Sequence, residues 1–159
     1  MRSPLNVLVL PFRGTPAGGF EYAVFRRADG DEACWQAVAG GVEVGETPRA
    51  AAERELTEET GLRSARRWIP LDAHATVPAR IFRDWPSWGP EVLVVRELTF
   101  AAEVAAEEVI RLSNEHDAFE WLGYAQARDR LRWDRNRTAL WELHTRLSEG
   151  LTTSRAPSP

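Results

Sequence analysis

Three glutamates that stand close together in the sequence are the residues best suited to chemistry. Glu55, Glu58 and Glu59 occupy positions i, i+3 and i+4, so in a helix their carboxylates would project from one face. Like charges at this spacing destabilise an isolated helix by roughly 0.2–0.5 kcal/mol per pair. Mg²⁺ and Mn²⁺ bind such carboxylate oxygens and would relieve the repulsion. Taken alone, the three residues also fit a solvated acidic face.

Signals on both sides of the glutamates predict the helix that would hold them. Thr47 suits an N-cap, Pro48 suits the first helical position, and Gly61 suits the C-terminal stop, which places a helix at Pro48–Thr60. The Gly40-Gly41 pair before it would let the backbone approach a metal or phosphate closely. A flexible glycine loop beside a rigid acidic helix favours binding of a cation and a phosphate group.

The remaining pattern predicts strands that alternate with helices. Candidate strands cover Asn6–Phe12, Phe20–Arg27, Trp35–Ala39, Val92–Phe100 and Ala118–Leu122. Apolar residues on both faces of Val92–Phe100 predict a strand in the interior of the sheet. A second amphipathic helix begins at Asp134 and ends at Gly150. The expected fold is a sheet with helices packed on its faces.

Length and composition indicate one globular domain. The chain has 159 residues, 43% of them hydrophobic, which fits a single domain over residues 1–151. Residues 152–159, rich in Ser, Thr and Pro, are expected to be a disordered tail. No apolar run reaches the roughly 18 residues of a membrane span, so we expect no contact with a membrane.

The charged residues limit the classes of binding partner, and the single cysteine bears on the cellular compartment. The formal net charge is −4, and every basic side chain is an arginine. This acidic balance disfavours nonspecific binding to nucleic acid. Cys34 has no second cysteine to pair with, and the N-terminal residues lack the pattern of a secretory signal. We therefore expect a cytoplasmic protein.

The spacing around the acidic helix resembles a family signature. Gly40 is followed after five residues by Glu46, and after seven more by the sequence from Arg54 to Leu62, which reads RELTEETGL. This arrangement matches the Nudix box, and the chain is identified as a member of the Nudix hydrolase family. The resemblance implies an α/β/α sandwich with a mixed central sheet. It also implies a hydrolase that uses Mg²⁺, or Mn²⁺ in its place, to cut a diphosphate linkage in nucleotide-like substrates.

The resemblance also implies roles for individual residues of the box. Glu55 and Glu59 would be the principal metal ligands, with Glu58 as a further ligand, directly or through water. The carbonyl of Gly40 would supply another oxygen. We expect Glu59 to face solvent.

The resemblance also implies supporting roles for residues around the metal site. Glu46 and Arg54 would form an ion pair that ties the loop to the helix, and Gly61 would have a structural role. Glu115, before a predicted strand, would be an additional ligand or the general base, with a surface glutamate as the alternative. The neighbouring His116 is expected to be a structural hydrogen-bond donor.

Flanking segments resemble one branch of the family, the dihydroneopterin triphosphate pyrophosphatases. The similarity lies in Phe25-Arg26-Arg27, the segment Trp35–Gly40, Glu115-His116, Trp121-Leu122 and Asn136-Arg137. It implies a nucleoside triphosphate-like substrate, with dihydroneopterin triphosphate as the leading candidate, cleaved to monophosphate and pyrophosphate. The alternatives are hydrolysis of dinucleoside polyphosphates or other nucleoside diphosphate derivatives, and a nucleotide-binding module without activity.

Four flanking residues are candidates for substrate contacts, each with a structural alternative. Arg26 and Arg27 suit phosphate binding or pairing with the acidic helix, and strand alternation allows only one of them to face the cleft. Trp35 suits ring stacking or core packing. Asn136 suits substrate contact or helix capping.

Aromatic residues suggest two further features. Trp85 and Trp88 lie among prolines and a glycine, which predicts a loop that could cover a flat heterocycle. The seven tryptophans of the chain are compatible with a homodimer.

Overall fold

The longest strand, β1 (Arg2–Gly14), runs through the middle of a seven-stranded sheet. The structure is a computed structural model that describes residues 1–30 and 34–151. The other strands are β2 (Phe20–Arg27), β3 (Trp35–Gln36), β4 (Val38–Glu43), β5 (Arg67–Pro78), β6 (Val94–Glu103) and β7 (His116–Leu122). The helices are α1 (Pro48–Thr60), α2 (Tyr124–Arg130) and α3 (Asp134–Glu149), with short 3₁₀ turns at η1 (Ala79–Ile81) and η2 (Trp85–Ser87). The predicted tail, 152–159, lies outside the described residues.

The sheet is mixed, as predicted. Its strand order is β3-β2-β1-β6-β5, with β4 also paired to β1 and β7 to β2. β1 and β6 are parallel, whereas the other pairs are antiparallel. The prediction of an interior strand over Val92–Phe100 is confirmed, because β6 lies between β1 and β5, although β6 runs from Val94 to Glu103.

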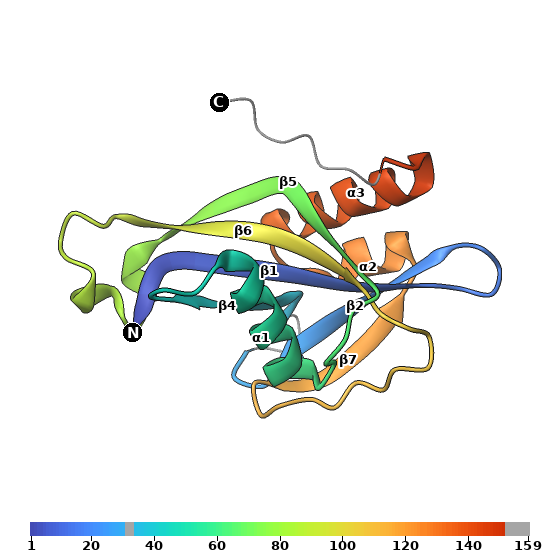
Figure 1. Ribbon diagram of the computed structural model, residues 1–159, viewed down its shortest axis with the longest axis horizontal. Coiled ribbons are helices and arrows are strands. Elements are labelled where there is room, and N and C mark those ends of the chain that lie inside the picture. The colour runs from blue at the N-terminus through green and yellow to red at the C-terminus, as the bar shows by residue number, and fades with distance from the viewer. Residues whose placement is uncertain (31–33, 152–159) are drawn as a thin grey trace.

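Alternate residues of β1 enter two separate cores. Val7 and Val9 pack with the α1 side chains of one core, while Leu8 and Leu10 pack with α2 and α3 in the other, because successive strand residues point to opposite faces. Figure 1 shows α1 on one face of the sheet and α3 on the other. The α/β/α sandwich is therefore confirmed.

Helix α1 has the predicted bounds for the predicted reasons. Thr47 Oγ1 accepts the Ala50 N–H at 3.1 Å, and Pro48 occupies the first turn, where no hydrogen-bond donor is needed. Gly61 ends the helix in the left-handed region, with φ of 72°, a conformation that favours glycine. These caps fix where the three glutamates lie along the helix.

Two elements were not predicted, and one was divided. β5 carries Pro70 and Pro78 and alternates exposed polar residues with buried apolar ones, as an edge strand does. α2 has only seven residues, too few for a clear helical period. The predicted strand Trp35–Ala39 is divided at Ala37 into β3 and β4. β4 continues through Gly40 and Gly41, which pair with Val7 and Asn6 of β1, so the prediction of a flexible glycine loop is wrong. None of the described helices has the length and apolar character needed to cross a bilayer.

Candidate active site

Gly40, in β4, lies directly against the side chain of Glu55 on the acidic helix. Glu55 is 4% exposed, and a Cβ atom built on Gly40 would overlap its carboxyl group. Only glycine therefore fits at position 40 without displacing the Glu55 carboxyl group. Burial raises the pKa of Glu55, and the hydrogen bond from Arg54 opposes that shift.

Glu59 is buried even more deeply than Glu55, so the expectation that it faces solvent is wrong. Its side chain is buried between α1 and β7, where His116 Nε2 lies 2.6 Å from Glu59 Oε2. Burial raises the pKa of Glu59, and the contact with His116 opposes the shift. His116 is itself buried, so it can fix the orientation of the Glu59 carboxylate, in line with its expected structural role.

Arg54 joins the loop to the helix. Its Nε and Nη2 donate to the two carboxylate oxygens of Glu46 at 3.0 and 2.9 Å, and Nη2 also donates to the Gly41 carbonyl at 2.8 Å. Its Nη1 donates to Glu55 Oε1 at 2.7 Å and to Glu58 Oε2 at 3.3 Å. The hydrogen bonds to Arg54 lower the pKa of Glu46. The Glu46–Arg54 ion pair is the contact that the resemblance implies.

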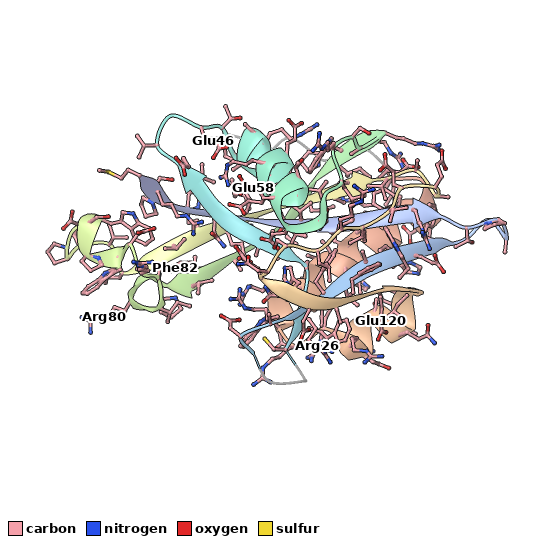
Figure 2. The ribbon with its side chains drawn as sticks, turned by 90° about the horizontal axis from the view of Figure 1, so that it is seen from below. Arg26, Glu46, Glu58, Arg80, Phe82 and Glu120 are labelled. Carbon is pink, nitrogen blue, oxygen red and sulfur yellow. The ribbon has the colours of Figure 1, made fainter. Side chains whose placement is uncertain are left out.

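Glu58 and Glu115 border the buried pair from the solvent side. Figure 2 shows Glu58 on α1, and its side chain is 59% exposed, so it is free to turn toward a ligand. Glu115 is exposed and directly precedes β7. Burial is the main cause of the raised pKa of Glu59, and the charge of Glu115 adds to it. The carboxylate of Glu115 is thus within electrostatic range of the site.

The oxygen donors fit a hard divalent cation, although they are not arranged as a ready-made cage. Across residues 1–30 and 34–151, no three His, Cys, Asp or Glu side chains are placed to hold a metal ion. Glu55 and Glu59 are instead hydrogen-bonded to Arg54 and His116. Both carboxylates are removed from water, so a cation would replace lost solvation. A metal bound by them would compete with these two partners.

Arg26 and Arg27 form ion pairs with neighbouring aspartates. Arg26 Nε donates to Asp117 Oδ1 at 2.6 Å, and Arg27 binds Asp29 through two hydrogen bonds. Figure 2 places Arg26 well away from Glu58. The Asp29 hydrogen bond is the main cause that raises the pKa of Arg27, with a smaller contribution from Glu115. Arg27 is therefore electrostatically coupled to a residue that borders the acidic site.

Trp35 and Asn136 are both buried, Trp35 in the core that α3 helps to form and Asn136 on α3 itself. Trp35 belongs to the core, and the Arg130 guanidinium lies 4.9 Å from its ring centroid. Asn136 Oδ1 accepts the Ala37 N–H at 2.8 Å, while its buried Nδ2 has no partner among the described residues. This contact interrupts the predicted strand at Ala37 and attaches α3 to the segment that leads to Gly40.

Comparison with known proteins identifies the family. A family profile described as the NUDIX domain matches residues 3–141, which include β4, α1 and the first half of α3. The chain belongs to the Nudix family. The box residues assembled here are therefore those of a Nudix fold.

Solved Nudix structures share this fold over nearly the whole chain. A Nudix hydrolase from Listeria monocytogenes is 35% identical, with a TM-score of 0.83, covering 96% of this chain and 100% of that one. The dihydroneopterin triphosphate pyrophosphohydrolase of E. coli is 26% identical, with a TM-score of 0.72, covering 91% and 97%. The resemblance to the Nudix hydrolases is confirmed.

Curated relatives differ from this Nudix chain in length. An octanoyltransferase from Myxococcus xanthus is 37% identical over 128 residues, covering 80% of this chain and 32% of that protein. Several further relatives carry the name RNA pyrophosphohydrolase. The chain spans about a third to a half of the length of the first curated relatives it matches.

One charged residue near the Nudix box was not identified from sequence. Arg2, at the start of β1, lies against Gly41, and its charge acts on the pKa of Glu55 after the larger effects of burial and Arg54. No motif surrounds Arg2 in the sequence, so only the pairing of β1 with β4 reveals its position.

Proposed function

We propose that this chain is a metal-dependent pyrophosphohydrolase that cuts a diphosphate linkage in a nucleoside triphosphate-like substrate, releasing a monophosphate and pyrophosphate. Dihydroneopterin triphosphate is the leading candidate. The observation that carries the proposal is the pair of buried carboxylates on α1, Glu55 placed against Gly40 of β4 and Glu59 against His116. Mg²⁺ is the proposed cofactor, with Mn²⁺ as a substitute.

The metal would be held by Glu55 and Glu59, with Glu58, Glu115 and the Gly40 carbonyl as the other oxygen donors. When bound, it supplies positive charge against the diphosphate oxygens and activates water for attack on phosphorus. Glu115, exposed beside the buried pair, is proposed as a further ligand or as the general base.

The protein's own side chains would act mainly by positioning. Arg54 holds Glu46, Gly41 and Glu55 at once, so the loop and the acidic helix keep one relative placement. His116 orients Glu59. A preorganised site of this kind stabilises charge in the transition state without rearranging during the reaction.

The branch motifs support a pterin or nucleoside triphosphate as substrate. The E. coli relative that acts on dihydroneopterin triphosphate shares 26% of its sequence with this chain, and the chain has the Arg26-Arg27 and Trp35–Gly40 segments of that branch. Arg26, Arg27, Trp35 and Asn136 are the substrate contacts proposed from the sequence. The burial of Trp35 in the core and the hydrogen bond from Ala37 to Asn136 support the structural alternatives for these two residues. The names of the RNA pyrophosphohydrolase relatives make a diphosphate linkage in RNA the second candidate. A cytoplasmic location and a homodimer stay predictions.

A substrate panel with Mg²⁺ tests the proposal. The panel contains dihydroneopterin triphosphate, the nucleoside triphosphates, diadenosine tetraphosphate, nucleotide sugars and a 5′-triphosphorylated RNA. Pyrophosphate release from the pterin or nucleoside triphosphates supports the proposal. Activity confined to nucleotide sugars would refute the substrate class, and tight nucleotide binding without turnover would refute hydrolysis.

A further inference from the structure

A cavity of about 420 Å³ opens beside Gly41 of β4. Its walls come from the start of β1, from Gly41 and from the segment around η2. A cavity of this size can hold a bicyclic ring. Gly41 follows Gly40, the residue in contact with Glu55, so the cavity begins one residue away from the acidic site.

Arg2 lies at the boundary between the cavity and the acidic site. Its stem rests on Gly41 so closely that a Cβ on residue 41 would come within 2.8 Å of Arg2 Cδ. Trp88 Nε1 donates to the Arg2 carbonyl at 2.7 Å, and the next residue, Ser3, donates its hydroxyl to the Val42 carbonyl at 2.9 Å. The backbone of Arg2 is therefore held by hydrogen bonds from both neighbouring segments.

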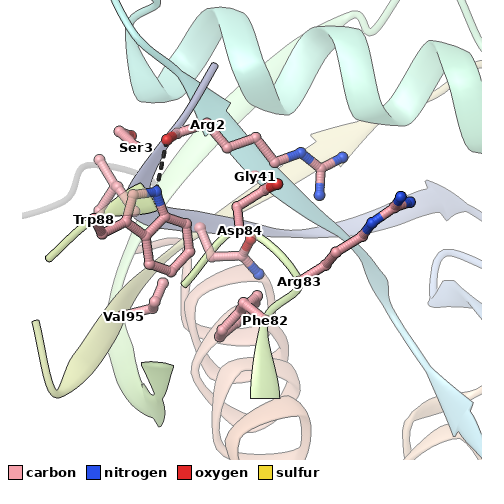
Figure 3. Close-up of a pocket in the computed structure, with 10 residues that line it drawn as sticks. Arg2, Ser3, Gly41, Phe82, Arg83, Asp84, Trp88 and Val95 are labelled. Atoms are coloured by element: carbon pink, nitrogen blue, oxygen red, sulfur yellow. Dashed lines mark hydrogen bonds between the residues drawn. The ribbon is translucent and has the colours of Figure 1, made fainter. Parts of the chain in front are cut away.

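The charged ends of Arg2 and Arg83 are available for a ligand. Both side chains line the cavity and extend in the same direction (Figure 3). Within the part of the chain that the structure describes, neither guanidinium makes a hydrogen bond or an ion pair with another residue. Arg54, in contrast, is occupied by Glu46 and Glu55. Asp84 also lines the cavity, and the charge of Arg2 acts on Glu55. Two guanidinium groups with no hydrogen-bonded partner at one opening are suited to bind phosphate oxygens.

Aromatic rings form another wall of the cavity. Phe82 and Trp88 have ring centroids 5.9 Å apart at an interplanar angle of 53°, and Leu5 and Val95 add apolar surface. The indole of Trp88 is fixed by its hydrogen bond to the Arg2 carbonyl. The aromatic wall and residue Arg2 are therefore positioned together. A flat heterocycle attached to a phosphate chain matches this combination of rings and cations.

We propose that this cavity binds the ring of the substrate, and that Arg2, assisted by Arg83, binds the phosphate chain where it passes from the cavity to the acidic helix. The inference rests on the proposed function, since it places the ring-bearing end of that same substrate. It assigns specificity to Arg2, Arg83 and Phe82, and a positioning role to Trp88.

Calorimetric titration in EDTA, where no turnover occurs, tests the proposal with two probes. Dihydroneopterin triphosphate carries a ring, and inorganic triphosphate carries none. Arg2→Ala should weaken both probes at least about tenfold, since it removes charge-assisted hydrogen bonds, and Arg2→Lys should recover part of the loss. Phe82→Ala should weaken only the ring-bearing probe, by about tenfold.

Arg80→Ala is the matched control. Arg80 has the same charge in the same segment, but its guanidinium lies over the Trp85 ring, outside the cavity (Figure 2). It should change neither affinity by more than about twofold, because its charge is solvent-screened. Thermal unfolding of each variant separates lost binding from lost folding.

The outcomes distinguish this inference from the proposed function. Unchanged binding of both probes to Arg2→Ala, or equal weakening of both by Phe82→Ala, would overturn the cavity assignment. If the wild-type protein turned over no pterin or nucleoside triphosphate, the proposed function would fail, whereas the inorganic triphosphate titration would still decide the role of Arg2.

Discussion

Gly40 of β4 lies directly against the carboxyl group of Glu55, so that the buried position of this carboxyl group depends on the absence of a side chain at residue 40. The two residues are 15 positions apart in the sequence. Any side chain at residue 40 would push Glu55 out of its buried place.

Gly40→Ala is expected to inactivate the protein. The new methyl group would overlap the Glu55 carboxyl group, and relieving that overlap costs about 1–3 kcal/mol of stability. Turnover with Mg²⁺ should fall on the order of 100-fold, since misplacement of about 1 Å costs that much. Gly123→Ala is the control, because a Cβ there meets no atom within 4 Å. Full activity of Gly40→Ala would contradict the described contact.

Glu59→Gln should separate catalysis from folding. The amide keeps the shape of the buried carboxyl and a hydrogen-bonding partner for His116, so the unfolding temperature should change little. Loss of the ligand charge should lower kcat on the order of 10²–10³-fold, equal to about 3–4 kcal/mol. Steady-state kinetics together with thermal unfolding measure both effects. A variant that retains wild-type kcat would remove Glu59 from the metal site.

The Glu46–Arg54 ion pair should contribute measurable coupling to stability. A double-mutant cycle with Glu46→Gln and Arg54→Met should give about 1–2 kcal/mol, because the bidentate pair is partly buried, with side chains 17% and 27% exposed. The Glu53–Arg49 pair on the same helix is 52% and 45% exposed and should give below about 0.5 kcal/mol. Urea unfolding measures both cycles, and equal coupling energies would show that Arg54 does not join loop to helix.

Mg²⁺ should raise the unfolding temperature of the wild-type protein. At about 100 times its Kd, a metal bound only to the folded state adds about 2.7 kcal/mol. Glu59→Gln should lose most of this increase, and EDTA should reverse it in the wild type. Calorimetric scans with and without Mg²⁺ give the answer independently of any substrate. The same increase in both proteins would place the metal elsewhere.

Asn136→Ala should reveal whether this buried residue supports the fold or binds the substrate. Loss of Oδ1 leaves the Ala37 N–H without its partner, at a cost of about 1–3 kcal/mol. Thr138→Ala, at an exposed position of the same helix, is the control. Urea unfolding and KM are measured together. A raised KM with unchanged stability would indicate that Asn136 contacts the substrate. Lost stability with an unchanged KM would indicate that Asn136 has a structural role.

Local signals were sufficient to predict α1 and β2. The cap at Thr47, Pro48 and the stop at Gly61 determine the ends of α1 through its own backbone hydrogen bonds. Those signals act within a few residues, so they can be read from the sequence. The Nudix spacing then indicated which residues meet at the acidic site.

Contacts between distant segments could not be predicted. The burial of Glu59 depends on His116, 57 residues later, and Arg2 reaches Gly41 only through the pairing of β1 with β4. The edge strand β5 carries Pro70 and Pro78, which disfavour a strand locally, and its pairing with β6 overrides that preference. Sheet pairing, which no short motif encodes, decides all of these positions.

The hydrogen bond from the Ala37 N–H to Asn136 ties α3 to the strand that carries Gly40, because Asn136 belongs to α3 and Ala37 directly precedes β4. In a random mutagenesis screen for loss of turnover, damaging changes should therefore cluster in the first turn of α3 as well as in the box. A map of such changes drawn on the sequence alone would mistake that turn for a second catalytic centre.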